Sequence, residues 1–538
     1  MSIKLTPALI FFLSIYEVVS CQNQDNTKKS LVTNVIPFYM KLIRLFSFSL
    51  IFNTSINAQI VYNNLDLFFY GLAQNNQFNG NVLIAEKGKT VYEMSFGYAD
   101  FSNNKLNTSN SRFPIASITK AFTATAILQL YEKGKLKIND PVEKYLPEFP
   151  YPTITIRHLL SHTSGLQPYD NFFEPIRKVH PDTVFTNKDI LTRYTTLKLP
   201  LFYQPGDDCN YDNINYVFLA LIVAKVAGME YHDYLEKYIF LPAKMKETFF
   251  PKVIFYNYVN NEKENLSNTY WYPHLYSVSL VKADTVQFIS KYWHAYNFQG
   301  FGEMVSTVRD LLKFDQALTN GYLLKSETLA KAYTPVLLNN GKPNPGNRNN
   351  NAFGMGWIIE NDSTYGKVGR ASGGGIGLRS TLLRNISRQQ TIILIDNTQN
   401  ETDDIARDVL KTLNGEHVKP YGKSAAKEYG KVLVAQGIKA ATNMMQKLKT
   451  DSALYSFNEN EFNSLGYDLM GSQKINEALE TFRLNTELFP HSWNVYDSYG
   501  EALLKDGQEE EAIRMYKKSV ELNQDNENGK KILEELLK

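Results

Sequence analysis

The stretch Phe113-Pro-Ile-Ala-Ser-Ile-Thr-Lys-Ala-Phe122 places a serine just before a long apolar run. The run continues to Tyr131 and is followed by Gly134, a pattern that predicts a helix over residues 121–131. Ser117 is therefore expected at the start of a helix. At that position, unpaired amide groups and the positive helix end favour a developing negative charge.

Lys120 follows Ser117 by three residues, so a helix would carry both side chains on one face, one turn apart. An amine at that distance can accept or relay the proton of a serine nucleophile. The spacing alone is weak evidence, because Ser-x-x-Lys occurs four times, at Ser102, Ser117, Ser279 and Ser424. The competing interpretation of Ser117 is a helix cap followed by a solvated lysine. Context singles out Ser117 among the four serines, because only this serine precedes a strongly apolar helix, but from this stretch alone the helix cap is the favoured interpretation.

Strand patterns lie on both sides of this helix within the first 400 residues. The expected strands are 82–85, 91–96, 355–359, 380–383 and 391–395. Two further helices are expected at 154–162 and 215–227. Strands at both ends of a domain and helices between them predict an α+β or layered α/β architecture.

A second candidate group is Tyr211-Asp-Asn213, which precedes the helix expected at 215–227. This spacing puts both side chains on one side of a turn or an extended segment. The phenol of Tyr211 is a possible base and the amide of Asn213 a possible donor. The signal is weak by itself, since two other Tyr-x-Asn sequences begin at Tyr62 and Tyr258.

Other reactive residues carry less information. His158 and His162 have the i, i+4 spacing of a metal pair, but no glutamate follows His158 in an H-E-x-x-H pattern, and a structural role is favoured. Cys209 adjoins Tyr211 without a motif that would make it a nucleophile. The G-x-S-x-G pentapeptide of Ser-His-Asp hydrolases is absent from the sequence.

The sequence beyond residue 400 changes character. Residues 401–449 have a helical pattern with a break at 415–422. A repeat of 34 residues follows, in which Phe462, Gly466, Ala478 and Phe482 recur as Tyr496, Gly500, Ala512 and Tyr516. This is the tetratricopeptide period, with small residues where paired helices touch. Since two repeats are fewer than the ~3 needed for independent stability, we expect them to pack on 401–449 or on the preceding domain.

The composition excludes several classes of protein. The chain has 538 residues, of which 57 are basic and 55 acidic, and it has no long basic run. A nucleic-acid partner is therefore not expected. The two cysteines, Cys21 and Cys209, exclude a disulfide framework.

Two segments near the amino terminus resemble export signals. The first is an apolar run over 8–13 that leads to Val18-Val-Ser-Cys21, as in a lipoprotein signal. The second begins at Met40, has a basic start and an apolar middle, and ends in the small-residue site Ile56-Asn-Ala58. We expect translation to begin at Met40, the mature chain to begin near Gln59 and the protein to be exported to the periplasm or secreted. Both runs are shorter than the ~20 apolar residues of a membrane span, so a retained anchor or lipid is the less favoured alternative.

Taken in order, four stretches resemble motifs of the class C β-lactamase, DD-peptidase and esterase family. They are Phe113–Lys120, Ile154-Thr-Ile-Arg-His-Leu-Leu-Ser-His-Thr-Ser-Gly165-Leu, Pro205-Gly through Tyr211-Asp-Asn213, and Met304-Val-Ser-Thr with Asp310-Leu-Leu. The resemblance spans about residues 65 to 400. It implies a β-lactamase/transpeptidase-like fold, with an antiparallel sheet flanked by helices and an all-helical subdomain.

The resemblance also implies roles for individual residues. Ser117 would be the nucleophile, Lys120 and Tyr211 would handle its proton, and Asn213 would orient the substrate. The backbone N–H of Gly374 would complete an oxyanion hole with that of Ser117. No metal or organic cofactor would be needed.

The third family motif is altered in this sequence. Family members have Lys-Thr-Gly or His-x-Gly on the strand beside the nucleophile, and the matching stretch here begins at Ala371. A group that would bind a substrate carboxylate is missing from that position. Arg379 is one possible substitute. Arg370 is another, but it should point to the opposite face of the strand. We therefore expect weaker β-lactam and carboxypeptidase chemistry.

The sequence thus predicts an exported serine hydrolase that acts through an acyl-enzyme on an ester, a D-amino-acid peptide or a β-lactam. The alternative is a catalytically weak binding or scaffold protein that holds protein partners through its repeats. The expected domains are an export region over 1–58 with the signal at 40–58, a hydrolase domain over 60–400, a helical linker over 401–455 and an all-α repeat domain over 456–538.

Overall fold

The computed structural model describes residues 61–169, 172–180, 183–251, 263–286, 296–345 and 351–538. Both expected export segments lie outside these residues. The chain divides into two compact units, Met1–Asn63 and Asn64–Lys538, and the second holds every feature that follows.

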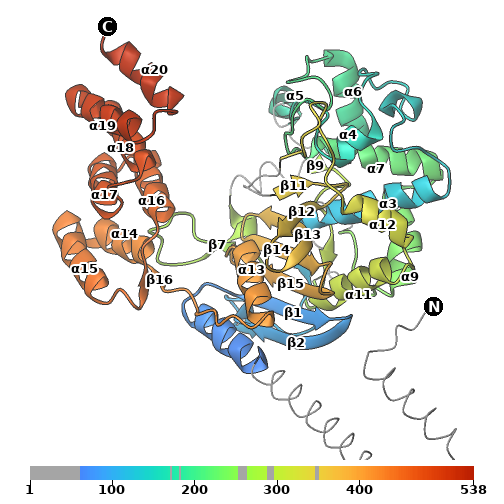
Figure 1. The fold of residues 1–538 in the computed structure, drawn as a ribbon, viewed down its shortest axis with the longest axis horizontal. Helices are drawn as coiled ribbons and strands as arrows, with labels where there is room; N and C mark the ends of the chain where they lie inside the picture. Colours follow the sequence, from blue (N-terminus) through green and yellow to red (C-terminus); the bar gives the residue numbers. More distant parts are fainter. Residues whose placement is uncertain (1–60, 170–171, 181–182, 252–262, 287–295, 346–350) are drawn as a thin grey trace, which may run out of the picture. The chain divides into compact units, whose positions relative to one another are not determined.

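A seven-stranded sheet forms the centre of the amino-terminal part of this unit (Figure 1). Its strands are β11 (Asn351–Phe353), β12 (Ile358–Asp362), β13 (Gly366–Gly375), β14 (Leu378–Asn385), β15 (Gln390–Asp396), β1 (Gly80–Glu86) and β2 (Lys89–Phe96), in that spatial order. Every neighbouring pair is antiparallel. The expected antiparallel sheet is confirmed. Strands from both ends of the domain meet where β1 pairs with β15.

Short strands and helices complete the elements. The short strands are β3 (Tyr98–Asp100), β4 (Lys105–Leu106), β5 (Phe113–Pro114), β6 (Phe185–Thr186), β7 (Tyr270–Trp271), β8 (Val281–Lys282), β9 (Tyr296–Asn297), β10 (Val305–Ser306), β16 (Lys423–Ser424) and β17 (Tyr455–Ser456). The helices before the repeats are α3 (Thr119–Glu132), α4 (Ile156–Leu160), α5 (Glu174–Val179), α6 (Asn187–Leu197), α7 (Ile214–Ala227), α8 (Tyr231–Leu235), α9 (Leu241–Ala243), α11 (Val308–Thr319), α12 (Ser326–Ala332) and α13 (Thr402–Leu413).

Two helices cover opposite faces of the sheet. Asp315 of α11 binds Arg384 of β14, whereas Asp403 of α13 binds Thr381 of the same strand. Because successive strand residues alternate between faces, Arg384 and Thr381 point in opposite directions. Ser380 shares the face of Arg384, and its hydroxyl binds the Ile115 carbonyl just before Ser117, so Ser117 lies on the face of the sheet that α11 covers, which is called the site face below. The domain boundary near residue 400 stays a prediction, although α13, which begins at Thr402, packs on β14 and β15.

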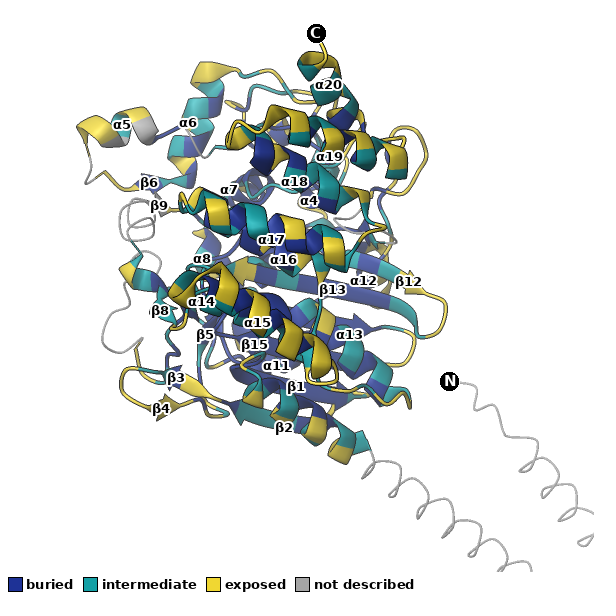
Figure 2. Cartoon of the chain, turned by 90° about the vertical axis from the view of Figure 1, so that its left-hand side faces the viewer, coloured by how far each residue is buried: buried dark blue, intermediate teal, exposed yellow. Residues whose placement is uncertain are grey.

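The central helix α3 is buried around nearly its whole circumference. The strands of the sheet are also largely buried, and Figure 2 draws much of β13 and β15 in dark blue. It packs against α7, whose first ten residues are buried apart from Leu221. Gly228 ends α7 with a φ of +67°, a conformation that glycine adopts without steric cost. The helices expected at 121–131 and 215–227 are confirmed to within two residues.

The third expected helix is present but shorter than predicted. The pattern at 154–162 predicts a helix through His162, but α4 ends at Leu160. His162 has a φ of +59°, in the left-handed region, so the chain has already turned away from the helix there.

The carboxy-terminal part consists of helix pairs. They are α14 (Ala425–Gln436) with α15 (Ile438–Thr450), α16 (Glu459–Gly471) with α17 (Ile475–Leu488), α18 (Trp493–Lys505) with α19 (Glu509–Leu522), and finally α20 (Glu527–Leu536). The first helices of successive pairs begin at Ala425, Glu459 and Trp493, and α20 begins at Glu527, always 34 residues apart. The period that the sequence shows in two repeats therefore continues on both sides of them.

Small residues allow these helices to approach closely. A side chain at Gly466 would lie 2.5 Å from the Phe482 ring, and one at Gly500 would lie 2.9 Å from Tyr516. The repeats also share an apolar core with α14 and α15. This is the packing on 401–449 that the sequence predicts.

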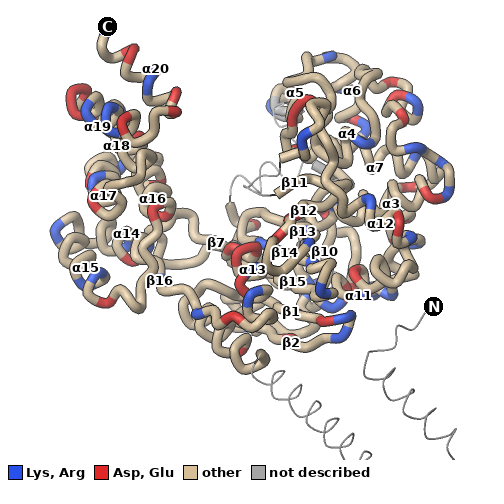
Figure 3. Tube along the Cα trace, in the orientation of Figure 1, with Lys and Arg blue, Asp and Glu red and all other residues tan. Residues whose placement is uncertain are grey.

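Within the described part of the chain, no single helix is long and apolar enough to cross a membrane. One bent pair of helices, Ile214–Ala227 with Tyr231–Ala243, has the length and the apolar composition of a membrane span, by those two criteria only. Basic and acidic residues are interspersed along the trace (Figure 3).

Candidate active site

Ser117 lies in a strained turn that leads into α3. A single 3-10 turn, Ala116–Ile118, carries it, and Ala116 has a φ of +44°. Left-handed backbone at a residue with a Cβ costs of order 1 kcal/mol and persists only where the surroundings enforce it. Here Ser380 Oγ donates to the Ile115 carbonyl at 2.8 Å, and the Ile115 N–H donates to the Met304 carbonyl at 2.9 Å. The position of the serine is thus fixed by β14 and by the segment before α11.

Lys120 is the centre of the hydrogen-bond network. Its Nζ lies 2.9 Å from Ser117 Oγ, 2.8 Å from Asn213 Oδ1 and 3.1 Å from the Phe301 carbonyl oxygen. A neutral amine has two N–H groups, which suffice for Asn213 Oδ1 and the Phe301 carbonyl, and its lone pair is then left for the Ser117 hydroxyl. The lysine is 4% exposed. A buried amine in contact with a serine hydroxyl can exchange a proton with it, which a solvated lysine beside a helix cap would not do.

Tyr211 lies against the same amine. Lys120 Nζ is 4.9 Å from the centroid of the Tyr211 ring. The ring also lies 4.4 Å from that of His162 and 6.0 Å from that of Phe353, centroid to centroid. Both Tyr211 and Asn213 come from the loop that precedes α7, so this one loop supplies two of the residues around Lys120.

The strand β13 forms the other wall of the site. A Cβ at Gly373 would lie 2.2 Å from the Ile115 carbonyl oxygen and 3.0 Å from the Ser117 amide nitrogen. The strand therefore approaches the serine turn so closely that only glycine fits. Gly374 follows directly, and pairing of β13 with β12 ends at Arg370, so residues 371–375 run beside Ser117 beyond the end of β12. A backbone N–H on such a segment is available to an oxyanion.

The arginines near β13 are bound elsewhere. Arg370 points to the opposite face, as its position in the strand predicts, and its guanidinium binds Glu360, Asp403 and Ser372. Burial acts to raise the pKa of Asp403, but Arg370 and the hydroxyl of Ser372 hold it below its ordinary value. Arg379 binds Glu401 at 3.2 Å. Neither arginine stands in for the side chain that Ala371 lacks.

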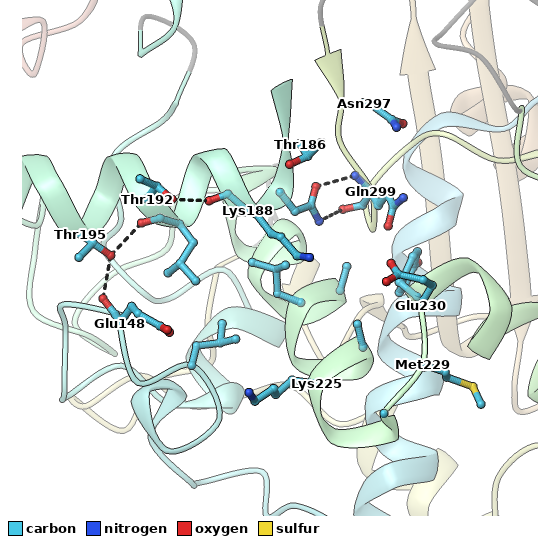
Figure 4. A pocket seen from close by; sticks show the side chains of 18 of the residues that line it. Glu148, Thr186, Lys188, Thr192, Thr195, Lys225, Met229, Glu230, Asn297 and Gln299 are labelled. Carbon is cyan, nitrogen blue, oxygen red and sulfur yellow. Dashed lines mark hydrogen bonds between the residues drawn. The ribbon is translucent and has the colours of Figure 1, made fainter. Parts of the chain in front are cut away.

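Ala371 lies on the site face and lines a cavity of about 30 Å³ together with Ser117, Lys120, Tyr211 and His162. A much larger cavity, about 970 Å³, lies between α6 and α7 (Figure 4). Lys188, Thr192 and Thr195 line it from α6, and it includes none of the residues around Ser117. The chemistry, not the volume, identifies the smaller cavity as the candidate active site.

The sequence gives no signal for one member of the site, the Phe301 carbonyl. The loop that carries it is folded around Glu303, whose carboxylate accepts the N–H groups of Gly300 at 2.7 Å, Phe301 at 3.2 Å and Gly302 at 2.9 Å. Burial acts to raise the pKa of Glu303, but His232 and the amides of Gly300 and Gly302 hold it below its ordinary value. The acceptor is a backbone atom, so a residue pattern does not identify it.

The remaining reactive residues have structural environments. His158 Nδ1 accepts the Thr155 N–H at 3.2 Å and caps α4. Among the described residues no group of three or more potential ligands could hold a metal ion. Burial raises the pKa of the Cys209 thiol to about 12, which keeps it protonated.

The burial of His158 predicts a pH dependence of stability. Burial first, and then the charge of Arg157, lower the pKa of His158 from 6.5 to about 4. The unfolded chain takes up this proton below pH 6.5 and the folded chain does not, so the free energy of unfolding should fall as the pH drops from 6.5 to 4. His158→Gln keeps an acceptor for the Thr155 N–H, because threonine followed three residues later by glutamine forms a capping box. We expect a smaller loss of stability in this variant than in the wild type over that interval, measured by urea unfolding. Equal losses would contradict the assignment.

Comparison with known proteins agrees with this geometry. The family model described as Beta-lactamase matches residues 68–413. Penicillin-binding protein 4* of Bacillus subtilis is 35% identical over 342 residues, which cover 63% of this chain and 72% of that protein.

Two solved structures share the fold. A penicillin-binding protein from Bacillus halodurans has a TM-score of 0.53 at 24% identity and matches 64% of this chain and 98% of its own. The D-amino acid amidase from Ochrobactrum anthropi has a TM-score of 0.53 at 22% identity and matches 66% of this chain and 99% of its own.

Proposed function

The chain belongs to the β-lactamase family, and from this we propose that it hydrolyses an ester, a D-amino-acid peptide or a β-lactam through an acyl-enzyme on Ser117. The observation that carries the proposal is the 2.9 Å contact between Lys120 Nζ and Ser117 Oγ in a buried site. A deprotonated amine at that distance accepts the hydroxyl proton as the oxygen attacks the substrate carbonyl.

The reaction proceeds in two steps. In the first step, Ser117 Oγ bonds to the carbonyl carbon of the substrate. Lys120 and Tyr211 take up the proton of the serine hydroxyl, and the amides of Ser117 and Gly374 bind the oxyanion. The tetrahedral intermediate collapses, the bond to the leaving group breaks, and the leaving group takes up the proton. In the second step, water attacks the acyl carbon by the same route and frees Ser117. Asn213, which holds Lys120 at 2.8 Å, orients the amine and the substrate.

Among the possible substrates, the observations favour those without a free carboxylate beside the scissile bond. Ala371 presents a methyl group where family members have a cation or an imidazole, and the guanidinium groups of Arg370 and Arg379 bind carboxylates away from the site. A neutral ester or amide needs no ion pair at this wall. We therefore propose that neutral acyl substrates react faster than carboxylate-bearing ones.

Turnover of chromogenic substrates tests the proposal. The panel is p-nitrophenyl butyrate, D-phenylalanine p-nitroanilide and nitrocefin, each with the wild type and with Ser117→Ala. We expect the wild type to hydrolyse at least the ester and Ser117→Ala to hydrolyse none of them. No turnover of any substrate by the wild type, or equal turnover by the variant, would overturn the proposal.

A cation at position 371 should change the preference. Ala371→Lys would place an ammonium beside a substrate carboxylate, and hydrogen bonds between charged groups contribute about 1.5–3 kcal/mol. We expect the ratio of acylation rates for benzylpenicillin and p-nitrophenyl butyrate to rise by roughly 10- to 100-fold. Ala371→Met has a chain of similar length without the charge, and it serves as the control for crowding in this small cavity. A ratio that rises equally in both variants would rule out an effect of the charge.

A further inference from the structure

His162 binds the backbone N–H groups of the two residues on either side of Tyr211. Its backbone carbonyl accepts the N–H of Asn210 at 3.0 Å, and its ring Nδ1 accepts the N–H of Asp212 at 3.3 Å. One residue therefore binds the chain immediately before and immediately after Tyr211. Rotation of that segment would break at least one of these hydrogen bonds.

The His162 ring also packs on the phenol itself. The centroids of the His162 and Tyr211 rings are 4.4 Å apart. The centroid of the imidazole is also 5.2 Å from that of the Tyr216 ring and 5.3 Å from that of the Phe353 ring. His162 is 2% exposed and lines the same cavity as Ser117. The ring is thus enclosed by aromatic side chains, and its orientation is as fixed as theirs.

The backbone of His162 makes this arrangement possible. Its φ of +59° ends α4 early and turns the residue back toward the Tyr211 loop. Such a conformation is costly for a residue with a side chain, and strain of this kind is retained at sites where the surroundings impose it. Filling space would not require the ring to accept the Asp212 N–H, so this hydrogen bond is what the histidine side chain adds to the backbone turn.

We propose that His162 is a positioning residue that holds Tyr211 in place for proton transfer from Ser117. The inference rests on the proposed hydrolase function and adds a residue to it. To accept the Asp212 N–H, Nδ1 must be unprotonated, so the neutral ring carries its proton on Nε2. Burial first, and then the charge of Lys120, hold the pKa of His162 well below its ordinary value, which keeps the ring in this form.

Two substitutions separate the acceptor from the ring. His162→Asn tolerates the left-handed backbone better than most residues and offers Oδ1 close to the place of Nδ1. His162→Phe keeps an aromatic ring but has no acceptor. With p-nitrophenyl butyrate as substrate, we expect His162→Phe to lower kcat by about 100-fold with little change in KM, because small displacements of a catalytic group have effects of this size. His162→Asn should retain most of the wild-type kcat. The thermal midpoint of each variant shows whether it is folded at the assay temperature.

A double-mutant cycle gives the decisive readout, since a merely structural role would not couple His162 to one side chain. If His162 acts through Tyr211, then His162→Phe should have little further effect on kcat in a Tyr211→Phe background. Multiplicative losses in the double variant, or a loss in His162→Asn as large as in His162→Phe, would overturn the inference and leave the hydrolase function standing. A wild type that turns over no substrate would instead overturn the hydrolase function and the inference with it.

Discussion

Replacing Lys120 by methionine is expected to lower kcat/KM for p-nitrophenyl butyrate by about 10³-fold, within the range that general bases contribute. The amine contacts Ser117 Oγ at 2.9 Å, and methionine has a chain of similar length without a proton acceptor. The position is 4% exposed, so the apolar side chain should be accommodated. The measurement is steady-state hydrolysis, with the thermal midpoint recorded to show that the variant is folded.

Lys133→Met is the matched control for Lys120→Met. Lys133 lies at the end of the same helix, and its ammonium is 4.3 Å from the centroid of the Tyr238 ring on the surface of the protein. We expect its kcat/KM to stay within about twofold of the wild-type value, as for most surface substitutions. A Lys120→Met variant that kept more than about a tenth of the activity would show that the amine is not the main proton acceptor.

Gly373→Ala should lower kcat/KM by about 100-fold, because it would displace the nucleophile. The new Cβ would lie 2.2 Å from the Ile115 carbonyl oxygen and 3.0 Å from the Ser117 amide nitrogen, and backbone atoms there cannot move without shifting the serine turn. Stopped-flow measurement of the acylation step would report the loss directly.

The neighbouring glycine provides the comparison for Gly373→Ala. At Gly374 a Cβ would meet the Arg379 guanidinium at 3.2 Å, which is the end of a flexible side chain. Gly374→Ala also keeps the backbone N–H that would bind the oxyanion. We expect a loss several times smaller than that of Gly373→Ala. Equal losses in the two variants would contradict the claim that close packing of β13 on the serine turn positions Ser117.

The parts of the site that the sequence predicts are those set by local geometry. Lys120 is three residues after Ser117 on the same helix, and helical spacing alone brings their side chains together. The contact of Asn213 with Lys120 depends on the fold, and it could be predicted only from the resemblance of the Tyr211–Asn213 stretch to a family motif. No pattern marks the Phe301 carbonyl, because it is a backbone atom placed by the carboxylate of Glu303.

Among the strands and helices, too, some are evident from local sequence and others depend on contacts between distant segments. Strands rich in branched side chains, such as β1 and β15, are evident from their composition. The strand β13 is not, because it carries three successive glycines beside the serine, where close approach requires them. The sequence repeat also does not reveal the helix pair α14 and α15, although the pair keeps the 34-residue period in the structure. Val432 and Met444 stand 34 residues before Gly466 and Ala478, and they lack the small side chains that mark the repeat.

The stop of α4 at Leu160 has the same kind of cause. The residues that follow, Ser161-His-Thr-Ser-Gly165, do not by themselves fix where the helix ends, and the left-handed turn at His162 redirects the chain toward the Tyr211 loop. Tertiary contacts to Asn210 and Asp212, which are distant in sequence, favour this turn over another turn of helix. Sequence periodicity therefore does not predict the left-handed turn that brings His162 to the Tyr211 loop.

The central claim is that Ser117 is an activated nucleophile, and intact-mass measurement after reaction with a fluorophosphonate, which phosphonylates serine, and with a fluorescent penicillin, which acylates it, tests the claim most directly. We predict that the wild type gains one fluorophosphonate adduct, located on the peptide that contains Ser117. The penicillin adduct should form more slowly than the fluorophosphonate adduct, because Ala371 provides no cation for the carboxylate of the penicillin. Ser117→Ala should gain neither. A wild type that remains unmodified by both reagents, or an adduct that persists in Ser117→Ala, would contradict the account.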